Sequence, residues 1–126
     1  MIHLFRKITH FFRGKKLGRN KLVKKIYPFF VALFNPIDVE GRKMFVDPYN
    51  DVLGILLDPL YEKEVGEVIK KRVKPGDVVA DLGAHIGFHT LLMAELVGKS
   101  GKVYAFEPDP VSFALLEKNV HVNGYK

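Results

Sequence analysis

The sequence predicts an α/β fold: an incomplete parallel-sheet unit that follows a small hairpin and a basic helical arm. The first observation is an alternation of two strand-like apolar runs, 78–82 and 102–106, with two helix-like runs, 87–97 and 109–123. The second is that glycine or Asp-Pro pairs bound these runs, as turns and helix starts require. Strand and helix in alternation indicate a parallel sheet with right-handed crossovers.

The composition sets limits on the class of protein. A chain of 126 residues that is 48% hydrophobic can form one modest core and is too apolar for disorder. There is no cysteine, which excludes disulfides and cysteine-based zinc or redox chemistry. The longest apolar run, 26–34, is far shorter than the roughly 20 residues of a membrane span. We expect a cytoplasmic location, with peripheral contact at a membrane as an open alternative.

The N-terminal arm, residues 1–36, carries the basic character of the chain. Residues 1–37 contain nine Lys/Arg and no Asp/Glu, whereas residues 38–126 contain eleven Lys/Arg and fourteen Asp/Glu, so the two parts are +9 and −3. Apolar residues of the segment 2–12 are spaced as on one side of a helix. We expect the arm to pack on the body or to contact a membrane surface through residues 1–34. Binding of nucleic-acid phosphates is the least favoured of the three alternatives.

The lead-in, residues 37–57, begins with a predicted hairpin. Ile37 and Val39 precede Glu40-Gly41, and apolar residues return at 44–46. A turn cluster follows at 47–51. The apolar run 52–57 fits a strand or a helix equally well.

The third part, residues 58–126, starts with Asp58-Pro59, which is typical of a helix N-terminus. That helix is predicted to continue to the turn 74–77, with acids early and bases late, as the helix dipole prefers. The strand 78–82, the helix 87–97, the strand 102–106 and the helix that begins at Asp109-Pro110 follow. Asn119 and Asn123 are expected to concern the end of this last helix.

Ligand-type residues gather where the two parallel strands end. Ligands of open parallel sheets bind beyond the carboxyl ends of the strands, and Asp81, Gly83, Gly87 and Glu107 all fall there. The two glycines let the backbone turn tightly and approach a ligand closely. The N–H groups at the start of the following helix favour a carboxylate, and Glu107 can accept hydrogen bonds from two ribose hydroxyls.

Two classes of nucleoside ligand use such an arrangement. Dinucleotides prefer the pattern G-x-G-x-x-G, whose middle glycine is absent from the stretch 83–87. The carboxylate of Asp81 would repel a pyrophosphate but would suit a cationic amino-acid tail. This combination favours S-adenosylmethionine, and a nicotinamide-dependent oxidoreductase is a lesser alternative.

The stretches 61–62, 74–77, 81–91, 104–110, 116–119 and 123–124 together resemble the FkbM family of S-adenosylmethionine-dependent methyltransferases. The resemblance implies a Rossmann-like, seven-strand methyltransferase fold and O-methylation of a sugar or small-molecule hydroxyl. It also implies that His85 stands where the family often has asparagine, and that acceptor-site residues lie beyond residue 126. The chain then corresponds to the N-terminal portion of such an enzyme and holds no catalytic residue. The expected cofactor-binding residues are Asp81, Gly83, Ala84, His85, Gly87, Glu107 and Pro108.

Several alternatives stay open. The chain could belong to an RNA methyltransferase, or the arm could make it a membrane-surface or partner-binding module without catalysis. In the complete enzyme the expected partner is a small-molecule or glycan acceptor, and a complementary chain or an oligomer would cover exposed sheet edges. His85 and His89 are four residues apart, but no third ligand accompanies them, so we expect no metal site. Tyr61 and Glu62 fit a cofactor rim and ordinary packing equally well.

Overall fold

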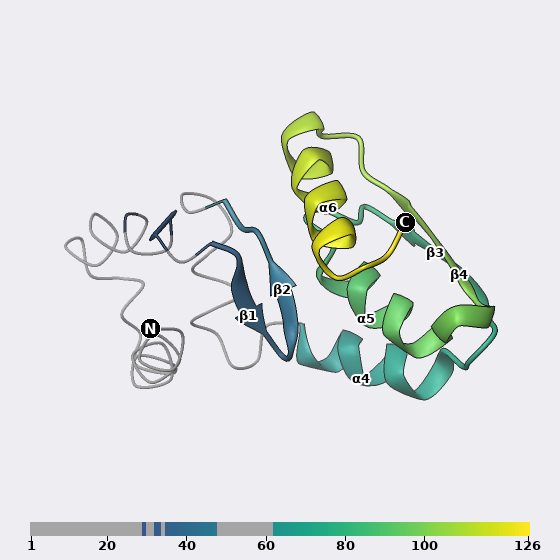
Figure 1. Ribbon diagram of the computed structural model, residues 1–126. Helices are drawn as coiled ribbons and strands as arrows, with labels where there is room; N and C mark the ends of the chain where they lie inside the picture. Colours follow the sequence, from purple (N-terminus) through teal and green to yellow (C-terminus); the bar gives the residue numbers. More distant parts are fainter. Residues whose placement is uncertain (1–28, 30–31, 34, 48–61) are drawn as a thin grey trace. The chain divides into compact units, whose positions relative to one another are not determined.

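The structure is a computed structural model that describes residues 29, 32–33, 35–47 and 62–126 (Figure 1). The helix expected at 2–12, the run 52–57 and the helix start at Asp58-Pro59 lie outside the described residues. The chain divides into two compact units, 1–61 and 62–126, which are described separately. Among the described residues, no helix combines the length and the apolar character that crossing a bilayer requires.

The described part of the first unit is a hairpin. Strand β1 (Ile37–Val39) pairs antiparallel with β2 (Arg42–Met44), with Ile37 opposite Met44. Both turn residues, Glu40 and Gly41, have positive φ angles of 52° and 87°, which suits a two-residue turn between twisted strands. The Asn35 side chain continues the pairing, since its Nδ2 donates to the Val46 carbonyl at 2.9 Å and its Oδ1 accepts from the Val46 N–H at 3.1 Å.

The second unit contains a two-stranded parallel sheet. Strand β3 (Val78–Leu82) pairs with β4 (Lys102–Phe106) in the register Val78 to Lys102 and Leu82 to Phe106. Both strands have the bounds that the sequence predicts. The structure therefore confirms an α/β unit with a small parallel sheet.

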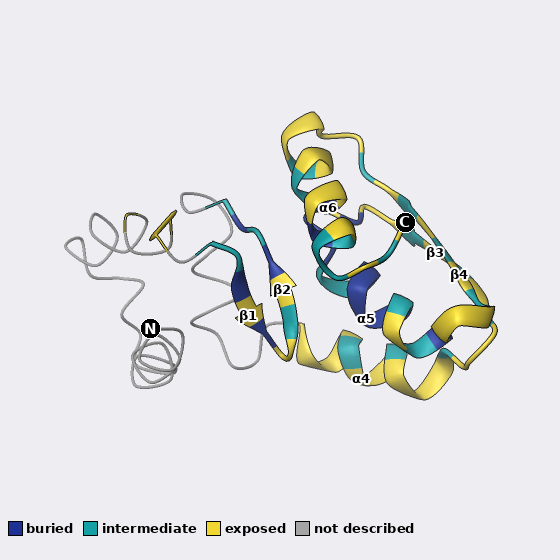
Figure 2. Cartoon of the chain, in the orientation of Figure 1, coloured by how far each residue is buried: buried dark blue, intermediate teal, exposed yellow. Residues whose placement is uncertain are grey.

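Helix α5 (Phe88–Val97) covers one face of this sheet and forms the core of the unit. It is apolar nearly all round, which is typical of a helix that is buried on several sides. Figure 2 shows the buried stretch of α5 in dark blue. Its buried residues are Thr90, Leu91, Leu92, Met93 and Val97.

Two further helices complete the second unit. Helix α4 (Lys63–Arg72) packs beside α5 and has no buried residue, so Figure 2 shows it mostly in yellow. The chain passes from α5 through a short 3-10 turn (Gly98–Ser100) into β4. Helix α6 (Pro110–Val122) begins after Asp109, whose side chain accepts from the Ser112 N–H, and ends before Asn123.

The face of the sheet away from α5 is open within the described residues. Parallel sheets are usually covered on both faces. Here four large apolar side chains of that face are between 48% and 78% exposed: Val78, Leu82, Tyr104 and Phe106. Apolar sheet surface is thus exposed within the described residues.

We predict that Asp109→Ala lowers the midpoint of thermal unfolding at neutral pH, whereas Asp109→Asn leaves it nearly unchanged. Asn is as good a helix N-cap as Asp, and Ala is not. The Ser112 N–H, followed by the Ser112 hydroxyl, lowers the pKa of Asp109 below its ordinary value of 3.8. The carboxylate thus contributes its stability fully above that ordinary value and loses it as the pH falls through the lowered pKa.

Circular dichroism melts at neutral pH and below pH 3.8 would check this prediction. The difference in melting midpoint between wild type and Asp109→Ala should shrink in acid. The difference between Asp109→Asn and Asp109→Ala should stay the same, because the asparagine cap does not titrate. An equal gap at both pH values would contradict a capping role for the carboxylate.

Candidate functional site

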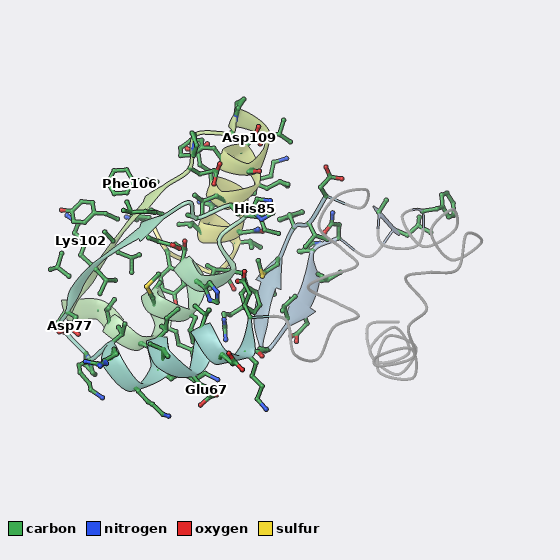
Figure 3. All side chains as sticks on the ribbon, turned by 180° about the vertical axis from the view of Figure 1, so that it is seen from behind. Glu67, Asp77, His85, Lys102, Phe106 and Asp109 are labelled. Carbon is green, nitrogen blue, oxygen red and sulfur yellow. The ribbon has the colours of Figure 1, made fainter. Side chains whose placement is uncertain are left out.

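The candidate site lies at the carboxyl ends of β3 and β4 and includes the β3–α5 loop, residues 83–87. The first two loop amides, of Gly83 and Ala84, both donate to the Phe106 carbonyl, at 2.9 and 3.0 Å. The loop is therefore attached to the last residue of the neighbouring strand. Figure 3 shows His85 and Asp109 toward one end of the unit and Asp77 toward the other.

The Glu107 carboxylate joins the two segments that leave the strands. Its Oε2 accepts from the backbone N–H of His85 at 2.7 Å, and its Oε1 accepts from the backbone N–H of Asp109 at 2.8 Å. A carboxylate has about four lone-pair positions, so each oxygen keeps room for one more donor. Glu107 is thus held in one orientation and can still accept hydrogen bonds from a ligand.

Three loop residues have positive φ angles: 77° at Gly83, 50° at His85 and 91° at Gly87. Glycine adopts such angles without steric cost, whereas His85 does so against the preference of an L-residue. The Glu107 carboxylate, which accepts from the His85 amide, supports this conformation. The His85 side chain is exposed at the same edge.

The two loop glycines have different surroundings. A Cβ at Gly83 would meet no atom within 4 Å, so this position is open to a ligand. A Cβ at Gly87 would lie 2.7 Å from Cδ1 of Leu116. Gly87 therefore permits close packing of the loop against α6, in addition to its place at the start of α5.

Asp81 lies on the helix-facing side of β3, where the Thr90 hydroxyl donates to its Oδ2 at 2.5 Å. Thr90 is buried and fixes the carboxylate against the first turn of α5. Thr90 was not among the predicted site residues; a hydroxyl residue in the first helical turn after a strand-end acid is the sequence signal that points to it.

Asn119 has a different role from the one that the sequence predicts. It is fully buried in α6, and its Nδ2 donates to the Ile86 carbonyl in the β3–α5 loop at 2.7 Å. Asn123, by contrast, is the residue that ends the helix, and its Nδ2 donates to the Asn119 carbonyl at 2.7 Å. The expectation that both asparagines concern the helix end is therefore right for Asn123 and wrong for Asn119.

Glu62 and His89 connect the starts of α4 and α5. Nε2 of His89 lies 2.6 Å from Oε2 of Glu62, a distance typical of an ion pair, although the two groups are not aligned as a hydrogen bond. The pair carries opposite charges when the imidazole is protonated. Tyr61, the other residue of the suggested cofactor rim, lies outside the described residues.

The structure brings together most of the residues that the sequence selects. Glu107, His85 and Gly83 meet at one edge, and the exposed Pro108 follows Glu107 directly. The Ala84 side chain is buried, and its amide donates to the Phe106 carbonyl. The amides of Gly83, Ala84, His85 and Gly87 all have protein acceptors. An anion site, as expected from the sequence, would have to use other amides, such as those of the first turn of α5.

The charge at this edge is acidic. Asp81, Glu107 and Asp109 lie there, and hydrogen bonds to Ser112 lower the pKa of Asp109. Such an edge suits a ligand with a cationic group and hydroxyl donors. It does not suit a pyrophosphate, because like charges would face each other.

The TRM5/TYW2 methyltransferase domain matches residues 42–126 of this chain. A dimethyladenosine transferase of Kluyveromyces lactis is 36% identical over 103 residues, which are 80% of this chain and 31% of that protein. The tRNA(Phe) (4-demethylwyosine(37)-C(7)) aminocarboxypropyltransferase of Pyrococcus horikoshii is 40% identical over 73 residues, which are 58% of this chain and 25% of that protein.

The resemblance to the FkbM family holds over a shorter segment. The 31-O-demethyl-FK506 methyltransferase FkbM of Streptomyces tacrolimicus is 51% identical over 47 residues, which are 37% of this chain and 18% of that protein. The broader match, over residues 42–126, is to a different methyltransferase family. In each of these three comparisons the chain spans less than a third of the relative's length.

We predict that Gly87→Ala destabilises the protein more than Gly83→Ala does. Both substitutions place an alanine at positive φ, which costs about 1–2 kcal/mol. Only Gly87→Ala also creates a clash, with Leu116, which adds about 1–3 kcal/mol. Urea unfolding followed by circular dichroism measures the free energy of unfolding of each variant.

Leu116→Ala provides the matched control for this comparison. In the Leu116→Ala background, the additional loss caused by Gly87→Ala should fall to the loss caused by Gly83→Ala. If the two glycine substitutions cost the same in the wild-type background, Gly87 does not pack as described.

Proposed function

Because the chain belongs to the TRM5/TYW2 methyltransferase domain family, we propose that it forms the cofactor-binding part of an S-adenosylmethionine-dependent methyltransferase that acts on RNA. The family match over residues 42–126 carries this proposal. It includes β3, the β3–α5 loop, α5, β4 and the segment that bears Glu107.

The geometry of the candidate site supports S-adenosylmethionine as the ligand. Glu107 is preoriented by two backbone amides and retains acceptor positions that suit the two ribose hydroxyls. Gly83 has no side chain and no atom within 4 Å of its Cβ position, so a ligand can approach the backbone there. Asp81, which is held by Thr90, supplies negative charge for the cationic methionine part.

When bound, S-adenosylmethionine supplies an electrophilic methyl group on its sulfonium. The residues of this chain bind and orient the cofactor: the Glu107 carboxylate would fix the ribose, and the β3–α5 loop would direct the methionine part. This is a contribution of positioning, which can lower a barrier without direct participation in the chemistry. Residues that bind the acceptor are not part of the proposal for this chain.

RNA as the acceptor class has two sources of support. The relative that matches the largest share of this chain is named as a dimethyladenosine transferase, and another is named for tRNA(Phe). In addition, residues 1–37 carry nine Lys/Arg and no acid, which suits contact with phosphates. This proposal replaces the expectation of a sugar or small-molecule acceptor, which remains the second candidate because of the 47-residue match to FkbM.

The cofactor proposal predicts that the full 126-residue chain binds S-adenosylmethionine and that Glu107→Ala weakens this binding about tenfold or more. The substitution removes a ribose acceptor and also releases the His85 amide. Isothermal titration calorimetry measures both affinities.

Glu117→Ala is the matched control, because Glu117 is an exposed acid within α6 and is not one of the proposed cofactor ligands. The affinity of Glu117→Ala for S-adenosylmethionine should equal that of the wild type. Tighter binding of NAD than of S-adenosylmethionine, or equal affinities for wild type and Glu107→Ala, would overturn the proposal.

The RNA proposal predicts that the chain binds a tRNA transcript with an affinity that falls steeply as the salt concentration rises. Deletion of residues 1–25 should weaken the binding and reduce the salt slope. Fluorescence anisotropy measures both quantities. Binding to anionic vesicles that is lost on the same deletion, without binding to RNA, would favour a membrane-surface role instead.

A further inference from the structure

The last two residues of the β3–α5 loop, Ile86 and Gly87, are not among those that hydrogen-bond to β4 or to Glu107. Its first residues are attached to β4 through the Phe106 carbonyl, and its middle is attached to Glu107. The last part, at Ile86 and Gly87, leaves this edge and turns into α5. Within the loop, the Gly87 amide donates to the Ala84 carbonyl at 2.8 Å.

This last part of the loop packs against helix α6. Ile86 is 1% exposed, so its carbonyl is remote from water, and the Nδ2 of Asn119 donates to it at 2.7 Å. One turn earlier on α6, Leu116 occupies the space in which a side chain at Gly87 would lie. Asn119 and Leu116 are three residues apart and share one face of the helix.

We propose that Asn119 is a positioning residue, which holds the β3–α5 loop in the shape that binds the cofactor. Asn119 lies 33 residues after Ile86 and belongs to the helix that follows β4. The same helix starts at Asp109, whose amide donates to Glu107. α6 and its cap residue Asp109 thus connect to two parts of the loop: Asp109 through Glu107 to the middle of the loop, and Asn119 to Ile86 near its end.

The chemistry of the contact explains why an asparagine is suited to this position. A buried carbonyl requires a donor, and a side-chain amide provides one without introducing a charge into a buried place. Leucine at this position would fill the space but would leave the Ile86 carbonyl without this donor. Aspartate has the same size, but its ionised form can only accept hydrogen bonds.

The effect on ligand binding is indirect, and the inference rests on the proposed function because the ligand is the proposed cofactor. Loss of the Asn119 contact would allow the loop to adopt several conformations, of which the binding-competent one is a fraction. The apparent affinity then falls to that fraction of its value for a fully ordered loop. Glu107 and Asp81 themselves would be unchanged.

The test compares Asn119→Asp and Asn119→Ala with the matched control Asn123→Ala. Asn123 follows the same helix directly and donates an equally short hydrogen bond of 2.7 Å, but to the backbone carbonyl of Asn119 and not to the loop. All three variants lose a side-chain amide donor. Only the two Asn119 variants lose the donor to Ile86.

Hydrogen exchange of the loop amides provides the first readout, with no need for a cofactor. The amides of Gly83, Ala84, His85 and Gly87 donate to protein acceptors and should exchange slowly in the wild type. They should exchange about tenfold faster or more in the Asn119 variants, relative to amides of β3 and β4 in the same protein. In Asn123→Ala their protection should match wild type.

Isothermal titration with S-adenosylmethionine provides the second readout. We expect about a tenfold loss of affinity in Asn119→Asp and less than about a twofold change in Asn123→Ala. Urea unfolding identifies variants of equal stability, so that a general loss of stability is separated from a loss of loop order. If Asn119→Ala does not fold, the exchange and affinity measurements on the isosteric Asn119→Asp still test the positioning role.

The outcomes separate this inference from the proposed function. If wild type does not bind S-adenosylmethionine, the proposed function fails, and the exchange data alone decide whether Asn119 orders the loop. If wild type binds and the Asn119 variants keep both loop protection and affinity, the positioning role is overturned. Faster loop exchange with unchanged affinity would also overturn it, because the loss of loop order would then have no effect on ligand binding.

Discussion

One carboxylate, that of Glu107, holds the candidate site together. It accepts two backbone N–H groups, from His85 and Asp109, which belong to the segments that follow two adjacent strands. A hydrogen bond to a charged group contributes about 1.5–3 kcal/mol. The bond from the His85 amide to Glu107 is exposed to solvent, so its contribution lies near the lower end of this range. That is enough to offset the roughly 1–2 kcal/mol that the left-handed conformation of His85 costs. The geometry of the loop therefore depends on Glu107 more than on the preferences of the loop residues.

The second unit combines an ordered site with an open sheet face. Within the part of the chain that the structure describes, the contacts that shape the site come from Phe106, Glu107, Thr90 and Asn119. The four exposed apolar side chains lie on the face of the sheet away from α5. The site uses the backbone carbonyl of Phe106, whereas the Phe106 side chain belongs to the open face.

The relatives show why the acceptor is harder to infer than the cofactor. Their printed names refer to an O-demethyl-FK506, to dimethyladenosine and to tRNA(Phe), although this chain resembles all three. The matched segments amount to less than a third of each relative. Function resides in the site and not in the fold, so a shared cofactor-type site does not identify the acceptor.

The sequence by itself determined most local elements of residues 62–126, although α4 begins at Lys63, after Glu62 in a left-handed conformation, and not at the predicted Asp58-Pro59. Strand bounds at 78–82 and 102–106, and the last helix between Asp109-Pro110 and Asn123, follow from apolar patterns and end signals that neighbouring residues carry. The gathering of Gly83, His85 and Glu107 was also predictable, because the carboxyl ends of adjacent parallel strands meet at one edge.

The tertiary structure alone decided which groups face each other across long separations. No local signal connects Asn119 to Ile86, Thr90 to Asp81, or Leu116 to Gly87, since helix packing creates these contacts. The same holds for the loop amides, which a sequence presents as free donors and which folding directs to Phe106 and Glu107. Periodicity and end signals act over a few residues, whereas the pairing of a buried donor with its acceptor depends on how the elements are stacked in space.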